Sequence, residues 1–220
     1  MGNAIIFLEA AIELVPKEIQ NHPSVKADAR RRGKRVEQIL LDDSKHHSAM
    51  KNLPFREKRG RADIIHQCLL LLLDSPVSNE FKIYIHTINN EIIKINPETR
   101  LPRNYNRFVG LLEDLFVKKR IVSKNSTLIE ITSLSLCDII EGKKVILMSE
   151  GGKKKRFRDL LTDDFVLCIG AFPHGNFFPE TVKALKDAEI ISLGPQPYTS
   201  LYVTSRVLCE YERVRFAEDC

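Results

Sequence analysis

Phe-Val-Leu-Cys-Ile-Gly-Ala-Phe-Pro-His-Gly, residues 165–175, is the stretch that decides the fold. Its first five residues are an unbroken apolar run, which is typical of a strand buried on both faces of a sheet. A glycine-bearing loop, 170–175, follows at once. Because open α/β sheets bind ligands at the carboxyl ends of their strands, the stretch predicts a central strand over 165–171 followed by a ligand loop.

The same arrangement occurs twice more in the C-terminal half. Strands predicted over 144–148 and 189–193 lead into Ser-Glu-Gly-Gly (149–152) and Ile-Ser-Leu-Gly-Pro-Gln-Pro-Tyr (191–198). Three glycine-bearing loops at strand ends indicate one ligand site, and ordinary turns between strands and helices are the alternative. None of the loops is a P-loop or a G-x-G-x-x-G motif, so the sequence supports neither nucleotide hydrolysis nor a standard dinucleotide fold.

Strand-like and helical patterns alternate along the rest of the chain, and this favours an α/β fold with a mostly parallel sheet and helices on both faces. Period-two runs over 82–87 and 91–95 around Asn89-Asn90 predict a hairpin. Further strands are expected over 4–8, 13–15, 36–41 and 127–132, and helices over 24–32, 64–74, 104–119, 180–186 and 200–215, with Ser24 as the N-cap of the first helix.

Two arginine-bearing motifs each precede a predicted helix: Gly-Arg-Ala-Asp-Ile-Ile-His (60–66) and Arg-Leu-Pro-Arg-Asn-Tyr-Asn-Arg (100–107). Helix N-termini favour anions, and arginine binds phosphate in a planar, bidentate manner. The motifs therefore predict a surface for a polyanion, with solvated charges as the alternative. Asp63 is either the N-cap of the helix over 64–74 or a residue with a second role in that surface.

The basic character of the chain is local. The 220 residues carry a net charge of +5, but residues 26–61 contain twelve basic and five acidic side chains, or +7. Five scattered cysteines without C-x-x-C spacing, and no signal peptide, indicate a cytoplasmic protein. No apolar run is long enough to cross a membrane, and the histidines lack the carboxylate cluster expected of a metal site.

Four segments together resemble one family. Gly-Arg-Ala-Asp-Ile-Ile-His-Gln-Cys-Leu-Leu-Leu-Leu-Leu-Asp-Ser-Pro (60–76) and Asn-Pro-Glu-Thr-Arg-Leu-Pro-Arg-Asn-Tyr-Asn-Arg-Phe (96–108) are highly specific, and 83–87 and 166–175 support them. They are similar to the small-subunit ribosome-biogenesis methyltransferases that act on pseudouridine, and the chain is most like the archaeal members. Ala62 stands where the family usually has proline.

The resemblance implies a SPOUT-type fold in a single domain spanning 1–220, with a C-terminal trefoil knot within 144–215 and a homodimeric assembly. It implies that S-adenosylmethionine is bound in the knot and that small-subunit rRNA lies on a surface formed by 26–61 and 96–108. The implied cofactor-binding residues are Ser149, Gly170, Gly175, Ile191, Ser192, Leu193, Gly194, Pro195 and Gln196, and the implied RNA-binding residues are Arg61, Asp63, Arg100, Arg103 and Arg107.

The implied reaction is methyl transfer to N1 of a pseudouridine, with Arg61 and Asp63 as the catalytic residues. Asp63 either orients the Arg61 guanidinium or accepts the proton, and orientation is favoured because a carboxylate paired with arginine is a weak base. The competing hypothesis is an RNA-binding assembly factor of the small subunit without catalysis as its main role. Small-subunit ribosomal proteins are further candidate partners, and a eukaryotic source would place the protein in the nucleolus.

Overall fold

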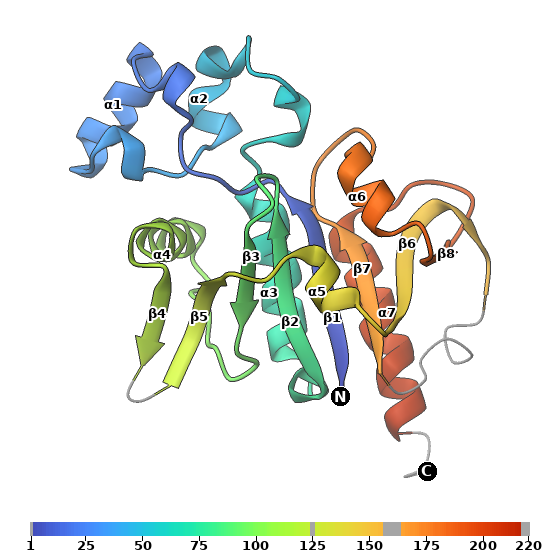
Figure 1. The fold of residues 1–220 in the computed structure, drawn as a ribbon. Helices are drawn as coiled ribbons and strands as arrows, with labels where there is room; N and C mark the ends of the chain where they lie inside the picture. Colours follow the sequence, from blue (N-terminus) through green and yellow to red (C-terminus); the bar gives the residue numbers. More distant parts are fainter. Residues whose placement is uncertain (1, 124–125, 156–163, 217–220) are drawn as a thin grey trace.

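The computed structural model describes residues 2–123, 126–155 and 164–216, which form an eight-stranded sheet in the order β4-β5-β3-β2-β1-β7-β6-β8 (Figure 1). Five strands pair in parallel: β1 (Asn3–Ala10), β2 (Phe81–Thr87), β7 (Phe165–Gly170), β6 (Lys144–Lys153) and β8 (Glu189–Ile191). The strands β3 (Ile92–Ile95), β5 (Ser126–Thr132) and β4 (Arg120–Ser123) pair antiparallel at one side. The predicted mostly parallel sheet is confirmed, with an antiparallel extension.

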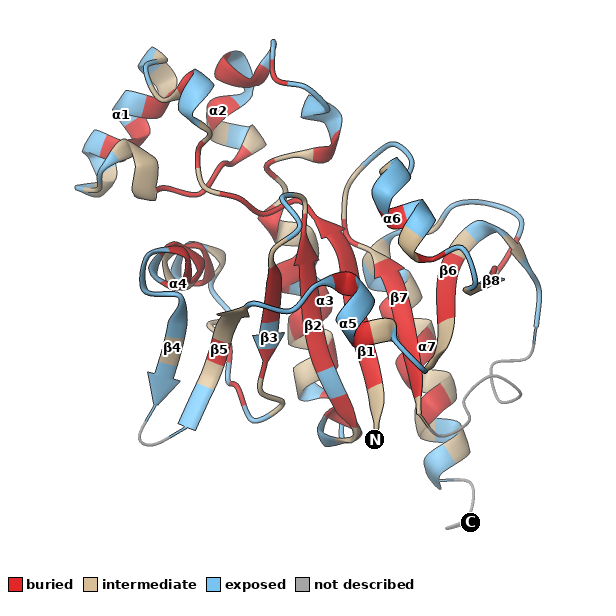
Figure 2. Ribbon diagram, viewed as in Figure 1, coloured by how far each residue is buried: buried red, intermediate tan, exposed pale blue. Residues whose placement is uncertain are grey.

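The central strands are buried on both faces, as the apolar run of β7 predicts (Figure 2). Phe165, Leu167 and Ile169 belong to one core, whereas Val166 and Cys168 belong to the other. The larger core lies under α3 (Ala62–Asp74), α4 (Tyr105–Lys118) and α7 (Ser200–Phe216), and the smaller core lies under α5 (Leu136–Ile140) and α6 (Pro179–Ala184). Helices therefore cover both faces of the sheet, as predicted.

The hairpin between β2 and β3 is also confirmed. The Thr87 N–H donates to the Glu91 carbonyl at 2.9 Å, and Asn90 adopts the left-handed conformation (φ 63°) that asparagine tolerates in tight turns. The helix expected over 104–119 is α4, and the Asn104 side chain caps it by accepting from the Arg107 N–H at 3.2 Å. The β4 strand and α5 were not predicted.

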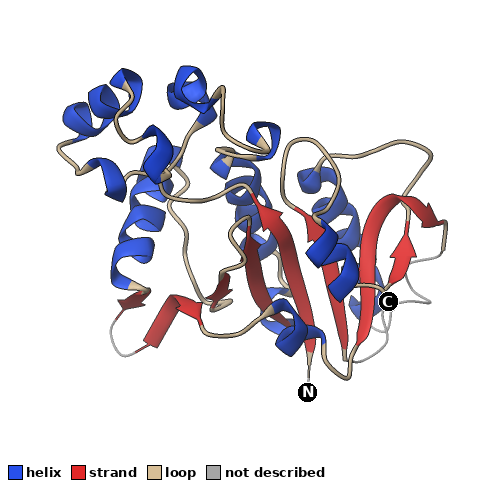
Figure 3. Ribbon diagram, turned by 45° about the horizontal axis from the view of Figure 1, so that its top comes forward, coloured by secondary structure: helices blue, strands red, loops and turns tan. Residues whose placement is uncertain are grey.

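An inserted helical region, residues 11–61, projects from the carboxyl ends of the parallel strands (Figures 1 and 3). It contains α1 (Pro23–Arg32), α2 (Asp43–Met50) and short 3-10 turns. The strand predicted over 36–41 is wrong, because residues 36–38 form a 3-10 turn and Leu40 makes an isolated bridge to Leu14. The strand predicted over 13–15 reduces to that bridge, and His22 rather than Ser24 caps α1.

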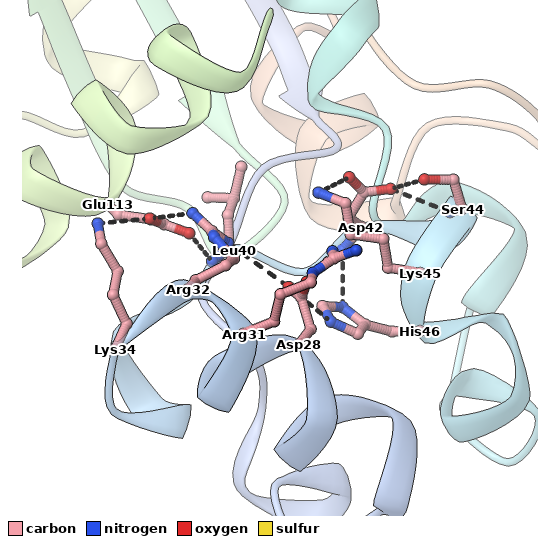
Figure 4. Close-up of polar contacts among 10 residues, drawn as sticks. All are labelled: Asp28, Arg31, Arg32, Lys34, Leu40, Asp42, Ser44, Lys45, His46 and Glu113. Carbon is pink, nitrogen blue, oxygen red and sulfur yellow. Dashed lines mark hydrogen bonds and ion pairs between the residues drawn. The ribbon is translucent and has the colours of Figure 1, made fainter.

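A buried carboxylate anchors the inserted helical region to the sheet domain (Figure 4). Glu113 on α4 is 1% exposed and accepts from Arg32 at 2.5 Å, from Lys34 at 2.7 Å and from the Leu40 N–H at 2.9 Å. Because all three donors come from the insert and the acceptor comes from the core, the contact fixes the position of the insert relative to α4.

A second polar cluster lies inside the insert itself, between α1 and α2 (Figure 4). His46 is fully buried, its Nδ1 accepts from the Asp42 N–H at 3.1 Å, and its Nε2 lies 3.6 Å from the Asp28 carboxylate. Burial lowers the pKa of His46 despite the nearby carboxylates, so the imidazole is neutral at pH 7. This histidine is therefore part of the packing between α1 and α2.

The predicted trefoil knot concerns the path of the chain within 144–215, and residues 156–163 of that segment lie outside the described residues. The knot stays a prediction. The Ser200 hydroxyl at the start of α7 donates to the Gly170 carbonyl at 2.6 Å, which holds the final helix against the end of β7.

Candidate active site

A cavity of about 890 Å³ opens at the carboxyl ends of β6 and β7. Three segments form most of its wall: Leu147–Glu150 within β6, Gly170 and 172–177 at and after the end of β7, and 197–200 with Val203 at the start of α7. The volume is within the range of small-molecule sites in proteins. Only parts of the three predicted loops line the cavity. The loop predicted over 149–152 is wrong, because these residues continue strand β6, and of 191–198 only Pro197 and Tyr198 are at the cavity wall.

The predicted cofactor residues fall into two groups. Ser149, Gly170 and Gly175 line the cavity. The predicted segment 191–196 does not line it in this structure, although its neighbours Ile190 and Pro197 do. The segment forms a tight turn closed by Ser192, whose hydroxyl donates to the Gly194 carbonyl at 2.5 Å and accepts from the Gly194 N–H at 3.2 Å.

Glycine is required at two points around this cavity. Gly175 adopts φ +94°, a conformation that residues with a side chain rarely adopt. A Cβ at Gly152 would lie 2.6 Å from backbone atoms of Ile191, so the close approach of β6 to β8 depends on the missing side chain. A Cβ at the neighbouring Gly151 would meet nothing within 4 Å.

Aromatic rings near the cavity were not singled out from the sequence. Phe172 and Phe177 line it and pack edge-to-face with ring centroids 5.3 Å apart. Tyr198 also lines it and packs on Tyr202 at 4.9 Å. Aromatic and apolar walls with a few backbone polar groups suit a planar ring such as a purine. The only sequence signal was the position of these residues in or directly after the glycine-bearing loops.

A buried ion pair holds the cavity loop, residues 170–177, against the inserted helical region. The Lys58 ammonium contacts the Glu9 carboxylate, donates to the Asn176 carbonyl at 2.6 Å, and lies 3.8 Å from the ring centroid of Phe172. Both charged side chains are buried, at 2% and 0% exposure. Lys58, assigned by the sequence to a basic surface, is therefore an internal contact between the insert and the cavity loop.

The first arginine motif lies next to this loop. The Ala171 N–H donates to the Leu8 carbonyl at 2.8 Å, the Ala11 N–H donates to the Ala171 carbonyl at 3.1 Å, and the Arg61 N–H donates to the Ala11 carbonyl at 3.0 Å. Through these bonds, Arg61 is fixed at the same carboxyl edge of the sheet as the cavity. Backbone hydrogen bonds thus join the first arginine motif to the loop after β7, although the two are far apart in the sequence.

Arg61 and Asp63 form a bidentate ion pair. The Nε and Nη2 atoms of Arg61 each donate to one carboxylate oxygen of Asp63 at 2.8 Å. The Arg61 guanidinium holds the pKa of Asp63 below its ordinary value. The N-cap position of α3 is occupied by Arg61 without a side-chain capping bond, so the prediction of Asp63 as the cap is wrong. Asp63 lies in the first turn of α3, and its carboxylate accepts both bonds from the Arg61 guanidinium.

The second arginine motif packs on α3 through a histidine. His66 Nε2 is 2.8 Å from the Pro102 carbonyl oxygen, and its ring stacks on Phe108 with centroids 4.2 Å apart. Arg103 donates to Asp74 at 2.9 Å on the exposed surface, while Arg100 and Arg107 are exposed. Both arginine motifs therefore contact α3. Arg61 is its N-cap residue, and Arg103 pairs with Asp74, its last residue.

The sequence model of the EMG1/NEP1 methyltransferase family matches residues 5–212 of this chain, which is nearly all of it. The chain belongs to the EMG1/NEP1 methyltransferase family. The family identified by resemblance, and the methyltransferase fold that came with it, are confirmed.

Relatives in this family match over almost their full length. The protein named ribosomal RNA small subunit methyltransferase Nep1 from Archaeoglobus fulgidus is 62% identical over 215 residues, covering 98% of both chains. A Thermococcus sibiricus protein of the same name is 43% identical, covering 94% of this chain and 96% of the relative. The crystal structure of the Archaeoglobus fulgidus Nep1 bound to S-adenosylhomocysteine superposes with a TM-score of 0.95, covering 98% of this chain and 99% of that one.

Tyr105, for which the sequence predicts no role, is a further candidate for the site. It begins α4, is half-buried, and lies near the Arg61 and Asp63 charges. Burial and the nearby carboxylates raise the pKa of Tyr105, so the phenol stays protonated and can donate a hydrogen bond. The signal in the sequence was its place between Arg103 and Arg107 in the family motif.

The basic surface of this methyltransferase is smaller than its charge count predicted. Within 26–61, several cations pair with carboxylates: Arg31, Arg32, Lys34, Arg35, Lys45, Lys58 and Arg59. Of these, Arg31 and Arg35 stay accessible, with side chains 70% and 75% exposed. Arg59, for example, forms a bidentate pair with the buried Glu13 at 2.6 and 2.7 Å. The exposed Lys26, Arg30, Lys51 and Arg56 remain as charges available to a polyanion.

In the part of the chain that the structure describes, no group of three or more metal-ligating side chains is close enough to hold a metal ion. None of the described helices combines the length and the apolar character needed to cross a bilayer.

Proposed function

We propose that this protein transfers a methyl group from S-adenosylmethionine to N1 of a pseudouridine in small-subunit rRNA. One observation carries the proposal: a relative named for methylation of small-subunit rRNA is 62% identical over 98% of the chain, and its structure with S-adenosylhomocysteine has the same fold. Relatives of this identity come from archaea, whose ribosomes assemble in the cytoplasm, so we place this activity there.

The residues around the cavity fit S-adenosylmethionine, whose sulfonium centre supplies an electrophilic methyl group when bound. Ser149, Gly170 and Gly175 present polar and backbone groups to the cavity, while Phe172 and Phe177 provide apolar surface. The segment Ile191, Ser192, Leu193, Gly194, Pro195 and Gln196 would hold the cofactor from the β8 side.

The Arg61–Asp63 pair handles the charge that develops on the nucleobase. Only pseudouridine carries an N1–H, because in uridine the glycosidic bond occupies N1. As that nitrogen gives its proton to solvent and takes up the methyl group, negative charge spreads over the ring, and the Arg61 guanidinium is oriented to stabilise it. Asp63 has a lowered pKa and is engaged by both guanidinium bonds, which makes it a poor base and a good orienting group.

The RNA would extend from Arg61 across Arg100, Arg103 and Arg107, which are exposed or half-exposed at the starts of α3 and α4. We further propose a homodimer, with the RNA contacting both protomers and with small-subunit ribosomal proteins as neighbours. Arg103→Ala should weaken RNA binding and reduce the salt slope of log K by about 0.7, as expected for one lost phosphate contact on a single strand. An unchanged slope would mean that Arg103 does not contact phosphate.

Calorimetry with S-adenosylhomocysteine separates this function from that of a non-catalytic assembly factor. The proposal predicts binding in the micromolar range or tighter, and transfer of tritium from labelled S-adenosylmethionine to an rRNA fragment. An assembly factor would bind the rRNA fragment, but it would show no heat with the cofactor product at high-micromolar concentration. That result would overturn the enzymatic proposal.

A further inference from the structure

Phe55 is an exposed aromatic residue in an unfavourable backbone conformation. Its side chain is 57% exposed, and its φ and ψ angles of 53° and 35° lie in the left-handed region. Bulky side chains rarely adopt this region, and such outliers cluster at functional sites. More than half of this residue is exposed, so burial accounts for only part of why a phenylalanine occupies this turn.

The turn that carries Phe55 is held rigidly. The Lys58 N–H donates to the Phe55 carbonyl at 2.9 Å, and the side chains of Lys58 and Arg59 pair with the buried carboxylates of Glu9 and Glu13. These two ion pairs fix residues 55–59 to β1 and the segment that follows it. A ring presented by a fixed turn loses little conformational freedom when a ligand binds.

The ring stands beside the proposed methyl-transfer site. Its centroid is 5.0 Å from that of Phe178, at an interplanar angle of 73°, and the Phe178 N–H donates to Glu9 at 2.7 Å. Lys58 from the same turn bonds the Asn176 carbonyl, and Asn176 lines the cavity. Phe178 therefore covers one side of Phe55, and the remainder of the ring faces solvent next to the cavity loop.

The charge around Phe55 suits an RNA backbone. Lys51 and Arg56 are exposed on the same segment, and Glu57 is the exposed acid between Arg56 and Lys58. An exposed aromatic ring among basic side chains is the usual arrangement for binding a single-stranded nucleic acid, in which the ring stacks on a base and the cations contact phosphates.

We propose that Phe55 is a stacking platform for a nucleobase of the RNA substrate, adjacent to the base that enters the methyl-transfer site. This inference rests on the proposed function. Stacking of this kind changes RNA affinity by about 5- to 150-fold per base. An unstacked neighbour held on Phe55 would also help to keep the target base out of its own stack.

The test compares Phe55→Leu, which removes the aromatic face, with Phe55→Trp, which retains it. Phe216→Leu is the matched control, because Phe216 is another exposed phenylalanine (44%) and lies at the far end of α7. RNA affinity is measured by fluorescence anisotropy with a pseudouridine-containing hairpin at several salt concentrations, and S-adenosylhomocysteine affinity by calorimetry.

Phe55→Leu should weaken RNA binding about 5- to 150-fold with an unchanged salt slope and unchanged cofactor affinity. Phe55→Trp should stay within about threefold of the wild type, as should Phe216→Leu. Wild-type RNA affinity in Phe55→Leu would overturn the inference and leave the proposed function intact. Equal losses in the Leu and Trp variants, or a loss of cofactor binding, would show a structural role instead. A wild-type protein that binds no RNA would overturn both proposals.

Discussion

Replacing Asp63 by asparagine separates the two roles that this carboxylate could have. In the structure both carboxylate oxygens accept from the Arg61 guanidinium, at 2.8 Å each. Asparagine keeps one acceptor oxygen and loses the negative charge. We therefore expect Arg61 to remain in place but to spend less time in the orientation that stabilises the developing charge on the base.

The magnitude follows from the exposure of the pair. The side chains of Arg61 and Asp63 are 41% and 37% exposed, so solvent screens much of the attraction. A bidentate pair screened in this way contributes about 1–2 kcal/mol, at or slightly above the range for exposed ion pairs. Loss of that amount from the transition state slows methyl transfer by about 5- to 30-fold.

Single-turnover transfer from labelled S-adenosylmethionine to a pseudouridine hairpin, followed from pH 5 to 9, measures the effect. The pKa of Asp63 lies below its ordinary value of 3.8, so the carboxylate is ionised, and the ion pair formed, across this range. The pair would be lost only as the pH falls through the lowered pKa. The wild type and Asp63→Asn should therefore show pH profiles of the same shape, displaced by a constant factor.

The double variant completes the test. If Asp63 acts through Arg61, then Asp63→Asn added to Arg61→Ala should cost little beyond Arg61→Ala alone. A general base would behave differently, with a loss of about 10²- to 10⁴-fold that is independent of Arg61 and a missing limb in the pH profile. That combination would refute the orienting role.

Three further predictions concern residues away from the reacting groups. Glu113→Ala should lower the free energy of unfolding by about 2–4 kcal/mol, because the Leu40 N–H and the partly buried Arg32 and Lys34 lose their shared acceptor. Its exposed neighbour is the control: Asp114→Ala should change the free energy by less than about 0.5 kcal/mol in urea titrations. Gly152→Ala should cost about 1–3 kcal/mol and weaken S-adenosylhomocysteine binding, and Gly151→Ala should do neither. His46 is buried in its neutral form and its pKa is lowered, so the free energy of unfolding should fall as the pH drops below 6.5, by up to about 1.4 kcal/mol per pH unit. His46→Gln should flatten that decline in the same titrations. An equally steep decline in this variant would contradict the assignment of His46 as the titrating group.

The parts of the fold with strong local patterning were predictable from the sequence. The apolar run at 165–169 required a strand buried on both faces, and the alternating runs around Asn89-Asn90 required a hairpin. Both features depend on a side-chain period that only one backbone conformation satisfies. The helix-entrance position of the two arginine motifs was predictable for the same reason, because each precedes a long amphipathic run.

The inserted helical region was not predictable in this way. The apolar residues Ile39, Leu40 and Leu41 resemble a strand, but their pairing is limited to the isolated bridge between Leu40 and Leu14. Packing within the insert and against the core buries their side chains. Asp42 directly follows that predicted strand, and its side chain accepts from the Ser44 N–H at 3.0 Å and caps α2. Contacts with residues distant in the sequence determine the conformation of this segment, and local sequence patterns do not reveal such contacts.

The sequence predicts candidate site residues, but it does not give the contacts that hold them in place. Nothing local indicates that Lys58 bonds Glu9 across 49 positions, or that Ala11 joins Arg61 to Ala171. These contacts depend on how distant segments meet at the edge of the sheet. They bring the first arginine motif and the loop after β7 next to each other at this edge of the sheet.

The central claim is that the protein methylates N1 of pseudouridine, and two hairpins that differ at one nucleotide test it most directly. Each carries either pseudouridine or uridine at the target, and nucleoside mass spectrometry follows incubation with S-adenosylmethionine. The account predicts N1-methylpseudouridine from the first hairpin and no methylated nucleoside from the second, since uridine has no N1–H to replace. Equal methylation of both hairpins, or of neither by a protein that binds S-adenosylhomocysteine, would contradict it.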